Sequence, residues 1–221
     1  MTRMEYSRVW QRSLSKLYDE QKASALLSRA QIFYDEYCAQ HSAEENRANK
    51  TMLKSRILPG LSIYKALLEE NKDQQKVLRE VDDLFRTAFF TRRMQGIRVL
   101  NHLPDPFPIL KPILKMMTRN EYVPGAQEIV EDSADCFALN VYRCFIFDTL
   151  AKHDAKELTA LYCNTDDWLA EVLPKIRWER TKTLGRGGDC CDFRWCRTDL
   201  TPVACGVLHD PLLQAERGVD E

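Results

Sequence analysis

The sequence lacks any apolar run long enough to cross a membrane, and its positive and negative charges almost cancel. A spanning helix needs ~20 consecutive apolar residues. The first residues, MTRMEYSRVWQRS, also lack the apolar segment of a signal peptide. The formal net charge of -1 provides no general attraction to nucleic acid or to anionic lipid. We therefore predict a cytoplasmic protein that binds neither nucleic acid nor membranes.

Histidine is also scarce, and the paired C-x2-C spacing of structural zinc sites is missing. None of the four histidines lies in a recognisable motif of a serine- or cysteine-based catalytic triad. Zinc held by Cys163, Cys190, Cys191 and Cys196 is left open as an alternative, although C-C-x4-C is not a usual zinc spacing. The sequence predicts no metal and no cofactor.

Cysteine itself is abundant, with eight residues, seven of which follow residue 135. In a cytoplasmic protein we expect mostly free thiols rather than a disulfide framework. Free cysteine is among the most buried residue types, so core packing is the expected role of Cys38, Cys136 and Cys205.

Apolar residues recur at helical spacing through most of the first 120 residues. We predict helices around Trp10–Tyr18, Leu26–Tyr37 and Val77–Phe89, and another in ILPGLSIYKALLEEN with Pro59 in its first turn. Four prolines in HLPDPFPILKP predict a connection rather than a regular helix, with a short helix from Ile113 to Met117.

The pattern changes after Asp132. Aromatic and β-branched residues predict a strand from Cys136 to Arg143. Helices are then expected in FIFDTLAKHDAKELTALYC and in NTDDWLAEVLP, the second capped by Asn164 or Thr165. Two strands, IRWERTKTL and CCDFRWCR, flank the turn GRGGD and predict a hairpin.

These elements together predict an α+β fold, in which four to six helices form a layer on a small antiparallel sheet that includes a C-terminal β-hairpin. We expect a single domain over residues 1–221. Residues 1–120 are mainly helical in this prediction, residues 133–197 carry the site, and residues 198–221 form a loosely ordered tail.

The hairpin sorts its side chains onto two faces, because strand residues alternate. With an even loop, such as residues 185–188, one face carries Trp178, Arg180, Lys182, Cys191, Phe193 and Trp195. The other face then carries Arg177, Glu179, Thr181, Thr183, Cys190, Asp192, Arg194 and Cys196. An odd loop would exchange the faces of the second strand.

The first face combines a thiol with two cations. Arg180 and Lys182 would lower the pKa of Cys191 and make it a nucleophile, and Arg180 could grip a substrate carboxylate with its two-pronged guanidinium. On the other face, Glu179 and Arg194 can pair across the strands in a structural role. The alternative is purely structural: Cys191 packs like an alanine, and Asp192 accepts hydrogen bonds from the turn.

The hairpin segment RTKTLGRGGDCCDF fits a pattern R-T-x-T-L-x-x-G-G-x-x-C-D-F through Arg180, Thr181, Thr183, Leu184, Gly187, Gly188, Cys191, Asp192 and Phe193. Upstream lie Arg143 and Cys144 in NVYRC, Cys163 and Asp166 in LYCNTDDW, and Pro59, Tyr64 and Leu67 in ILPGLSIYKALLE. This series resembles the L-2-amino-thiazoline-4-carboxylic acid hydrolase family from Ile57 to Arg194. Cys190 is a thiol additional to the family pattern.

The resemblance implies a hydrolase of a small cyclic amidine carboxylic acid, in which water adds to the ring carbon between sulfur and nitrogen and the carbon–sulfur bond breaks. It suggests Cys191 as the attacking sulfur, Asp166 or Asp192 as the group that moves protons, and Cys163 as a further catalytic thiol. Candidate substrate contacts are Arg180 for the carboxylate, Thr181 and Thr183 for water, and Cys144 in the pocket wall. Helix capping by Asp166 and core packing of Cys144 are the structural alternatives.

Two other functions stay open from the sequence. One is a non-hydrolytic enzyme of secondary metabolism, such as an isomerase or cyclase, on the same scaffold. The other is a ligand-binding or thiol-sensing module without turnover. In each case the expected partner is a small molecule, and the sequence leaves open whether the chain forms a homo-oligomer.

Overall fold

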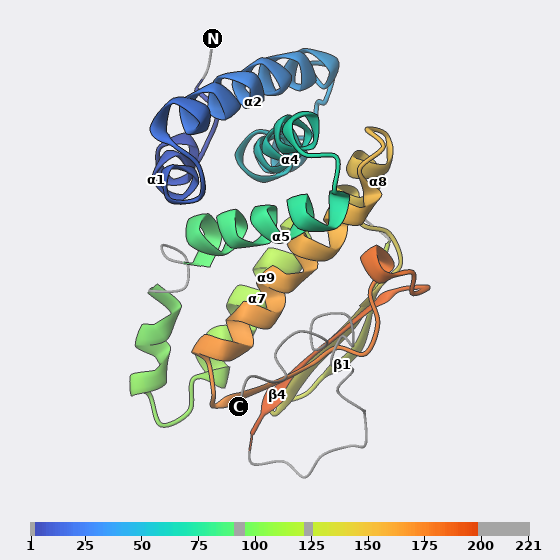
Figure 1. Ribbon diagram of the computed structural model, residues 1–221. Helices are drawn as coiled ribbons and strands as arrows, with labels where there is room; N and C mark the ends of the chain where they lie inside the picture. Colours follow the sequence, from blue (N-terminus) through green and yellow to red (C-terminus); the bar gives the residue numbers. More distant parts are fainter. Residues whose placement is uncertain (1–2, 91–95, 122–125, 199–221) are drawn as a thin grey trace.

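The computed structural model describes residues 3–90, 96–121 and 126–198, which form a helical layer over one antiparallel sheet (Figure 1). The predicted α+β class is therefore confirmed. No helix in these three ranges is long and apolar enough to span a membrane. The predicted tail lies outside the described residues, apart from Thr198.

The N-terminal helices follow the predicted apolar stripes. They are α1 (Ser7–Leu17), α2 (Glu20–Gln40), α3 (Arg47–Met52), α4 (Leu58–Glu70) and α5 (Gln74–Phe85). The Asp19 side chain accepts a hydrogen bond from Lys22 N at 2.7 Å, so a new helix starts there. Buried Trp10 donates its indole N–H to Leu84 O at 2.9 Å and fixes α1 against α5.

Two segments of π-helix interrupt this layer, η1 (Leu53–Ile57) and η2 (Arg86–Phe90). A π-helical turn leaves backbone carbonyls out of the usual pattern and is often found at functional sites. The Tyr162 hydroxyl supplies the missing partner at η1, because it contacts Arg56 O at 2.9 Å and Ile57 O at 3.1 Å.

The proline-rich segment forms more helix than predicted. After the short 3-10 turn η3 (Val99–His102), α7 runs over Phe107–Glu121 and contains Pro112. Residues Ile113–Met117 are helical as predicted, but the predicted connection before them is wrong: the helix begins at Phe107, because Phe107, Leu110 and Leu114 make a continuous buried stripe against the sheet. That packing outweighs the one backbone hydrogen bond that Pro112 cannot make.

The sheet has the order β1-β2-β4-β3, with every neighbouring pair antiparallel. Its strands are β1 (Gln127–Asp132), β2 (Cys136–Val141), β3 (Ile176–Glu179) and β4 (Cys191–Arg197). The edge strand β1 was not predicted. Phe137, Leu139 and Val141 of β2 share the buried face with their partners in β4, and α7 and α9 cover this face (Figure 1).

The segment between β2 and β3 folds into α8 (Phe145–Ala151), the 3-10 turn η4 (Lys156–Leu158) and α9 (Thr159–Val172). The predicted helix start at Asn164 or Thr165 is wrong, because both lie in the middle of α9. The Thr165 hydroxyl donates to Tyr162 O at 2.7 Å, and the Asn164 amide binds Asp82 and Arg186.

The hairpin pairs in the register expected for an even loop, with Trp178 opposite Trp195. Its connection is longer than predicted: β3 ends at Glu179, and the 3-10 turn η5 (Leu184–Arg186) precedes Gly187, whose φ of 87° suits glycine. The predicted Glu179–Arg194 pair does not form. Glu179 instead pairs with Arg177 at 3.1 Å, and Arg194 donates to Asn140 Oδ1 at 2.9 Å.

Two cysteines that were expected to be free thiols form a disulfide instead. Cys136 and Cys196 are register partners on β2 and β4, and their sulfurs are bonded. The prediction that Cys136 only packs in the core is therefore corrected. Among the described residues, five cysteines are free: Cys38, Cys144, Cys163, Cys190 and Cys191. Cys205 lies outside the described residues.

Candidate active site

A cavity of about 330 Å³ lies between the helical layer and the covered face of the sheet. Pockets of ~300–1,000 Å³ are typical of sites for small organic ligands. Four of the predicted site residues line this cavity, namely Cys144, Cys163, Asp166 and Cys191. They come from segments that lie far apart in the sequence, so the fold brings together side chains that the sequence could only list.

Helix α9 provides the polar wall of the cavity. Thr159, Cys163 and Asp166 follow one another at i, i+4 and i+7, which places them in a row on one face of the helix. Thr159 is 1% exposed, and its hydroxyl has no hydrogen-bond partner among the described residues. A buried hydroxyl without a partner is costly, so Thr159 Oγ1 is suited to bind a ligand in the cavity. The sequence analysis missed this residue.

The three cavity thiols lie close enough to influence one another. The pKa of Cys191 is raised to about 12 and that of Cys144 to about 11, in both cases mainly by burial and to a smaller extent by proximity to Cys163. The predicted lowering of the Cys191 pKa is therefore wrong. Arg180 does favour the Cys191 thiolate, but burial outweighs it, and Lys182 is paired with Asp189 at 2.5 Å.

The surroundings of Cys163 favour ionisation of its thiol more than those of Cys191 do. Burial and the charge of Asp166 raise the pKa of Cys163, whereas the charge of Arg180 and a hydrogen bond from the Thr183 hydroxyl lower it, and the pKa stays above its ordinary value. Cys163 also remains partly exposed, whereas Cys191 is 5% exposed, and the hydrogen bond that Cys191 accepts from Leu184 N at 3.3 Å lowers its pKa too little to offset this burial. Of the two thiols, Cys163 is the better placed to ionise.

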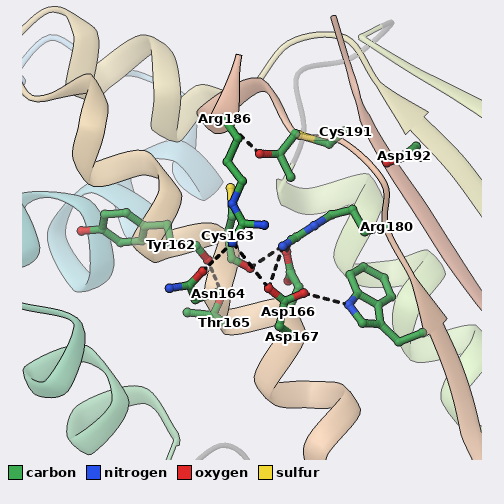
Figure 2. A network of polar contacts seen from close by, with 12 residues as sticks. Tyr162, Cys163, Asn164, Thr165, Asp166, Asp167, Arg180, Arg186, Cys191 and Asp192 are labelled. Atoms are coloured by element: carbon green, nitrogen blue, oxygen red, sulfur yellow. Dashed lines mark hydrogen bonds and ion pairs between the residues drawn. The ribbon is translucent and has the colours of Figure 1, made fainter. Parts of the chain in front are cut away.

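Arg180 holds α9 to the loop that follows β3 (Figure 2). Its guanidinium donates to Cys163 O at 3.0 Å and to Asp167 Oδ2 at 2.8 Å, and it lies 3.4 Å from Asp166 Oδ2. Its side chain is 3% exposed and is not part of the cavity wall. The geometry thus gives Arg180 two carboxylate partners within the protein, in place of the expected substrate carboxylate.

Asp192, Thr181 and Thr183 support the site rather than line it. The Asp192 carboxylate points to the opposite side of β4 from Cys191 and accepts hydrogen bonds from Thr181 N at 2.9 Å and from Lys182 N at 2.8 Å. Thr181 also donates its hydroxyl to Asp192. Thr183 is buried and accepts a hydrogen bond from Arg186 N at 3.1 Å. Asp192 thus takes the turn-bonding role that was the structural alternative.

The cavity wall also contains a positively charged residue that the sequence analysis did not indicate. Arg56, from η1, is the single lysine or arginine among the described residues of the cavity wall. Arg56 is thus the residue of the wall that could supply a positive charge to a bound carboxylate, and the same wall contains the carboxylate residues Glu5 and Asp166. Arg56 can be identified only from the structure, because η1 continues directly into α4 and has no distinct sequence pattern.

The four sulfurs considered for zinc do not come together, because Cys196 is bonded to Cys136 and only Cys163 and Cys191 line the cavity. Over the described ranges, no three or more His, Cys, Asp or Glu side chains have the arrangement of a metal site.

Alkylation should report the protonation of the cavity thiols directly. Because the pKa values of Cys144 and Cys191 are raised to about 11 and about 12, their thiolate fractions grow about tenfold per pH unit between pH 7 and 9. We expect iodoacetamide rates at both residues to follow this slope in tryptic peptide mapping. The unfolded protein is the control, since its thiols should level off near pH 9. A flat profile at Cys191 above neutral pH would contradict the raised pKa.

Fold and site together define an α+β protein with a cavity of the size of a small organic ligand, lined by three free thiols and by two carboxylate residues, Glu5 and Asp166. The family model of L-2-amino-thiazoline-4-carboxylic acid hydrolase matches residues 50–195. The chain belongs to this family, as its motifs indicated. No curated protein and no solved structure matches the chain.

Proposed function

We propose that the protein hydrolyses a small cyclic amidine carboxylic acid of the thiazoline type and opens the ring at its carbon–sulfur bond. The observation that carries the proposal is the convergence of Cys144, Cys163, Asp166 and Cys191 on one cavity. These four residues belong to three separate segments that resemble motifs of a family named for this reaction, with Cys163 and Asp166 in the same segment. A cytoplasmic role in small-molecule metabolism is part of the same proposal.

In the proposed mechanism Cys163 replaces Cys191 as the nucleophile. The Cys163 thiol gives its proton to Asp166, and the sulfur attacks the ring carbon between sulfur and nitrogen. The carbon–sulfur bond of the ring breaks, and Asp166 returns the proton to the leaving ring sulfur. Water then attacks the same carbon with Asp166 as the base, the bond to Cys163 breaks, and Asp166 passes the proton from water to the Cys163 sulfur. The product is a carbamoyl derivative that contains a new free thiol.

Three further residues serve this reaction in the proposal. Arg56 binds the carboxylate of the substrate from the cavity wall. Thr159 donates its otherwise unpartnered hydroxyl to the ring nitrogen or accepts a hydrogen bond from the amino group. Arg180 is a positioning residue, because it holds Asp166 and the Cys163 carbonyl on α9 (Figure 2).

A ligand-binding protein without turnover is the second candidate. One observation favours it: burial keeps the cavity thiols protonated by raising their pKa values. A base must then remove the proton from one of these thiols before its sulfur can attack a substrate.

A turnover assay with L-2-amino-thiazoline-4-carboxylic acid separates these functions. We expect one new thiol per substrate consumed, measured with a colorimetric thiol reagent, and a product mass equal to substrate plus water. A product with the mass of the substrate would instead indicate an isomerase or cyclase. Saturable binding with an unchanged ligand would indicate the binding protein, and would contradict the proposed hydrolysis.

A further inference from the structure

The cavity is larger than the compound for which the family is named. A cavity of ~150 Å³ lined by hydrocarbon holds one benzene molecule. The name-giving compound is a single five-membered ring with an amino and a carboxylate group; it has about one and a half times the non-hydrogen atoms of benzene and so needs ~220 Å³ on the same scale. The present cavity, at about 330 Å³, would leave a substantial part of its volume unfilled around such a ligand.

The unfilled space has a distinct chemistry. All the described cavity residues between positions 88 and 117 are hydrocarbon or thioether side chains, contributed by η2, η3, α7 and Ile97. They are Ala88, Phe89, Ile97, Leu100, Leu110, Ile113, Leu114 and Met117. The charged, hydroxyl-bearing and thiol-bearing residues stand on other segments, with Glu5 before α1, Arg56 on η1, and Thr159, Cys163 and Asp166 on α9. The described residues of this apolar wall therefore have no charged or hydroxyl side chain that could bind a polar substituent.

The same wall reaches the surface. Ile113 lines the cavity and is 39% exposed, and Met116 beside it on α7 is 58% exposed. A chain of apolar atoms leaving the polar groups can follow α7 toward solvent while it stays in contact with hydrocarbon. Burial of apolar surface of this kind supplies binding free energy in proportion to its area.

We infer that the substrate is a cyclic amidine carboxylic acid carrying an extended apolar substituent that lies along α7. This inference rests on the proposed function and specifies its substrate. The ring and carboxylate lie between Arg56, Thr159 and Cys163, and the substituent fills the space beside Leu110, Leu114 and Met117.

Two series of alkylated substrates test the inference, one alkylated on the exocyclic nitrogen and one on ring carbon 5, with chains from methyl to hexyl. In at least one series kcat/KM should rise by about fourfold per methylene until the chain reaches the rim, the factor that one buried methylene provides. Flat or falling values in both series, with the unsubstituted acid hydrolysed well, would overturn the inference and leave the proposed function standing.

A matched pair of variants on α7 locates the effect. Ile113→Trp narrows the cavity and should reduce the ratio of kcat/KM for hexyl over methyl substrate by about tenfold or more. Ile109→Trp is the control, because Ile109 is one helical turn away, 48% exposed and outside the cavity wall. An equal change of the ratio in both variants would contradict placement of the substituent along α7.

Absence of turnover with every compound would overturn the proposed reaction, and binding then decides the inference. The probes are the aromatic 2-(alkylamino)-thiazole-4-carboxylic acids, measured by calorimetry with the intact chain. Affinity that rises with chain length would support an apolar ligand in a protein without this activity. Affinity independent of chain length would overturn both proposals.

Discussion

Replacement of Cys163 by serine should lower kcat by about a thousandfold or more, the scale at which removal of a catalytic nucleophile acts. The reason lies in the surroundings of the sulfur. Arg180 and the Thr183 hydroxyl favour its thiolate against the opposing effects of burial and of the Asp166 charge, and Asp166 lies on the same face of α9 as the proposed base. Steady-state rates of thiol release measure the change.

Two further serine variants serve as controls for the Cys163→Ser result. Cys38→Ser removes a thiol on α2, outside the cavity wall, and should keep the wild-type rate. Cys191→Ser alters a thiol in the wall whose pKa is raised to about 12, and it should cost far less than Cys163→Ser. A large loss at Cys191 with little loss at Cys163 would restore Cys191 as the nucleophile.

Mass spectrometry can identify the attacking sulfur independently. A quenched single turnover should leave an adduct of the substrate mass on tryptic peptide 157–175, in which Cys163 is the sole cysteine. The peptide that contains Cys191 should stay unmodified. An adduct on that second peptide would contradict the mechanism even if both serine variants lost activity.

The sequence predicted those parts of the site that depend on local periodicity. Alternation along a strand put Cys191 and Asp192 on opposite sides of β4, and the observed register agrees with the even-loop prediction. Helical stripes gave α2, α4 and α5, although the break at Asp19 needed its capping hydrogen bond. The family motifs listed the thiols that the fold then gathers.

The remaining features depend on contacts that local sequence does not encode. The pKa of Cys191 follows from burial under helices distant in the chain, so the nearby cations in sequence gave the wrong sign. Arg180 meets Asp166 and Asp167 only after α9 has packed beside β3. Strand β1 has a mostly exposed surface and so no apolar alternation to read. In α7, long-range packing outweighs a local proline rule.

The second large expected effect is a loss of stability on substitution of Gly60, which packs against the cavity residue Tyr162. Gly60→Ala should lower the free energy of unfolding by about 3 kcal/mol, because overpacking costs ~1–3 kcal/mol and the displaced hydrogen bonds cost ~0.5–1.5 kcal/mol each. A Cβ atom at this position would lie 2.1 Å from the Tyr162 hydroxyl and 2.5 Å from Phe85 Cζ. The hydroxyl cannot move without leaving the carbonyls of Arg56 and Ile57.

Thermal unfolding measures this effect, and a fall of about 10 °C is expected for a chain of this length. Gly96→Ala is the matched control, because a Cβ there meets nothing within 4 Å, and alanine at a helical position should leave stability unchanged or slightly higher. Equal melting temperatures for the two variants would contradict the close packing at Gly60. Tyr162→Phe introduced into Gly60→Ala should recover part of the loss, since it removes the nearer clashing atom. Because Tyr162 joins α9 to η1, and these two segments carry Cys163 and Arg56, the same contact that stabilises the fold also sets the spacing between the proposed nucleophile and the proposed carboxylate site.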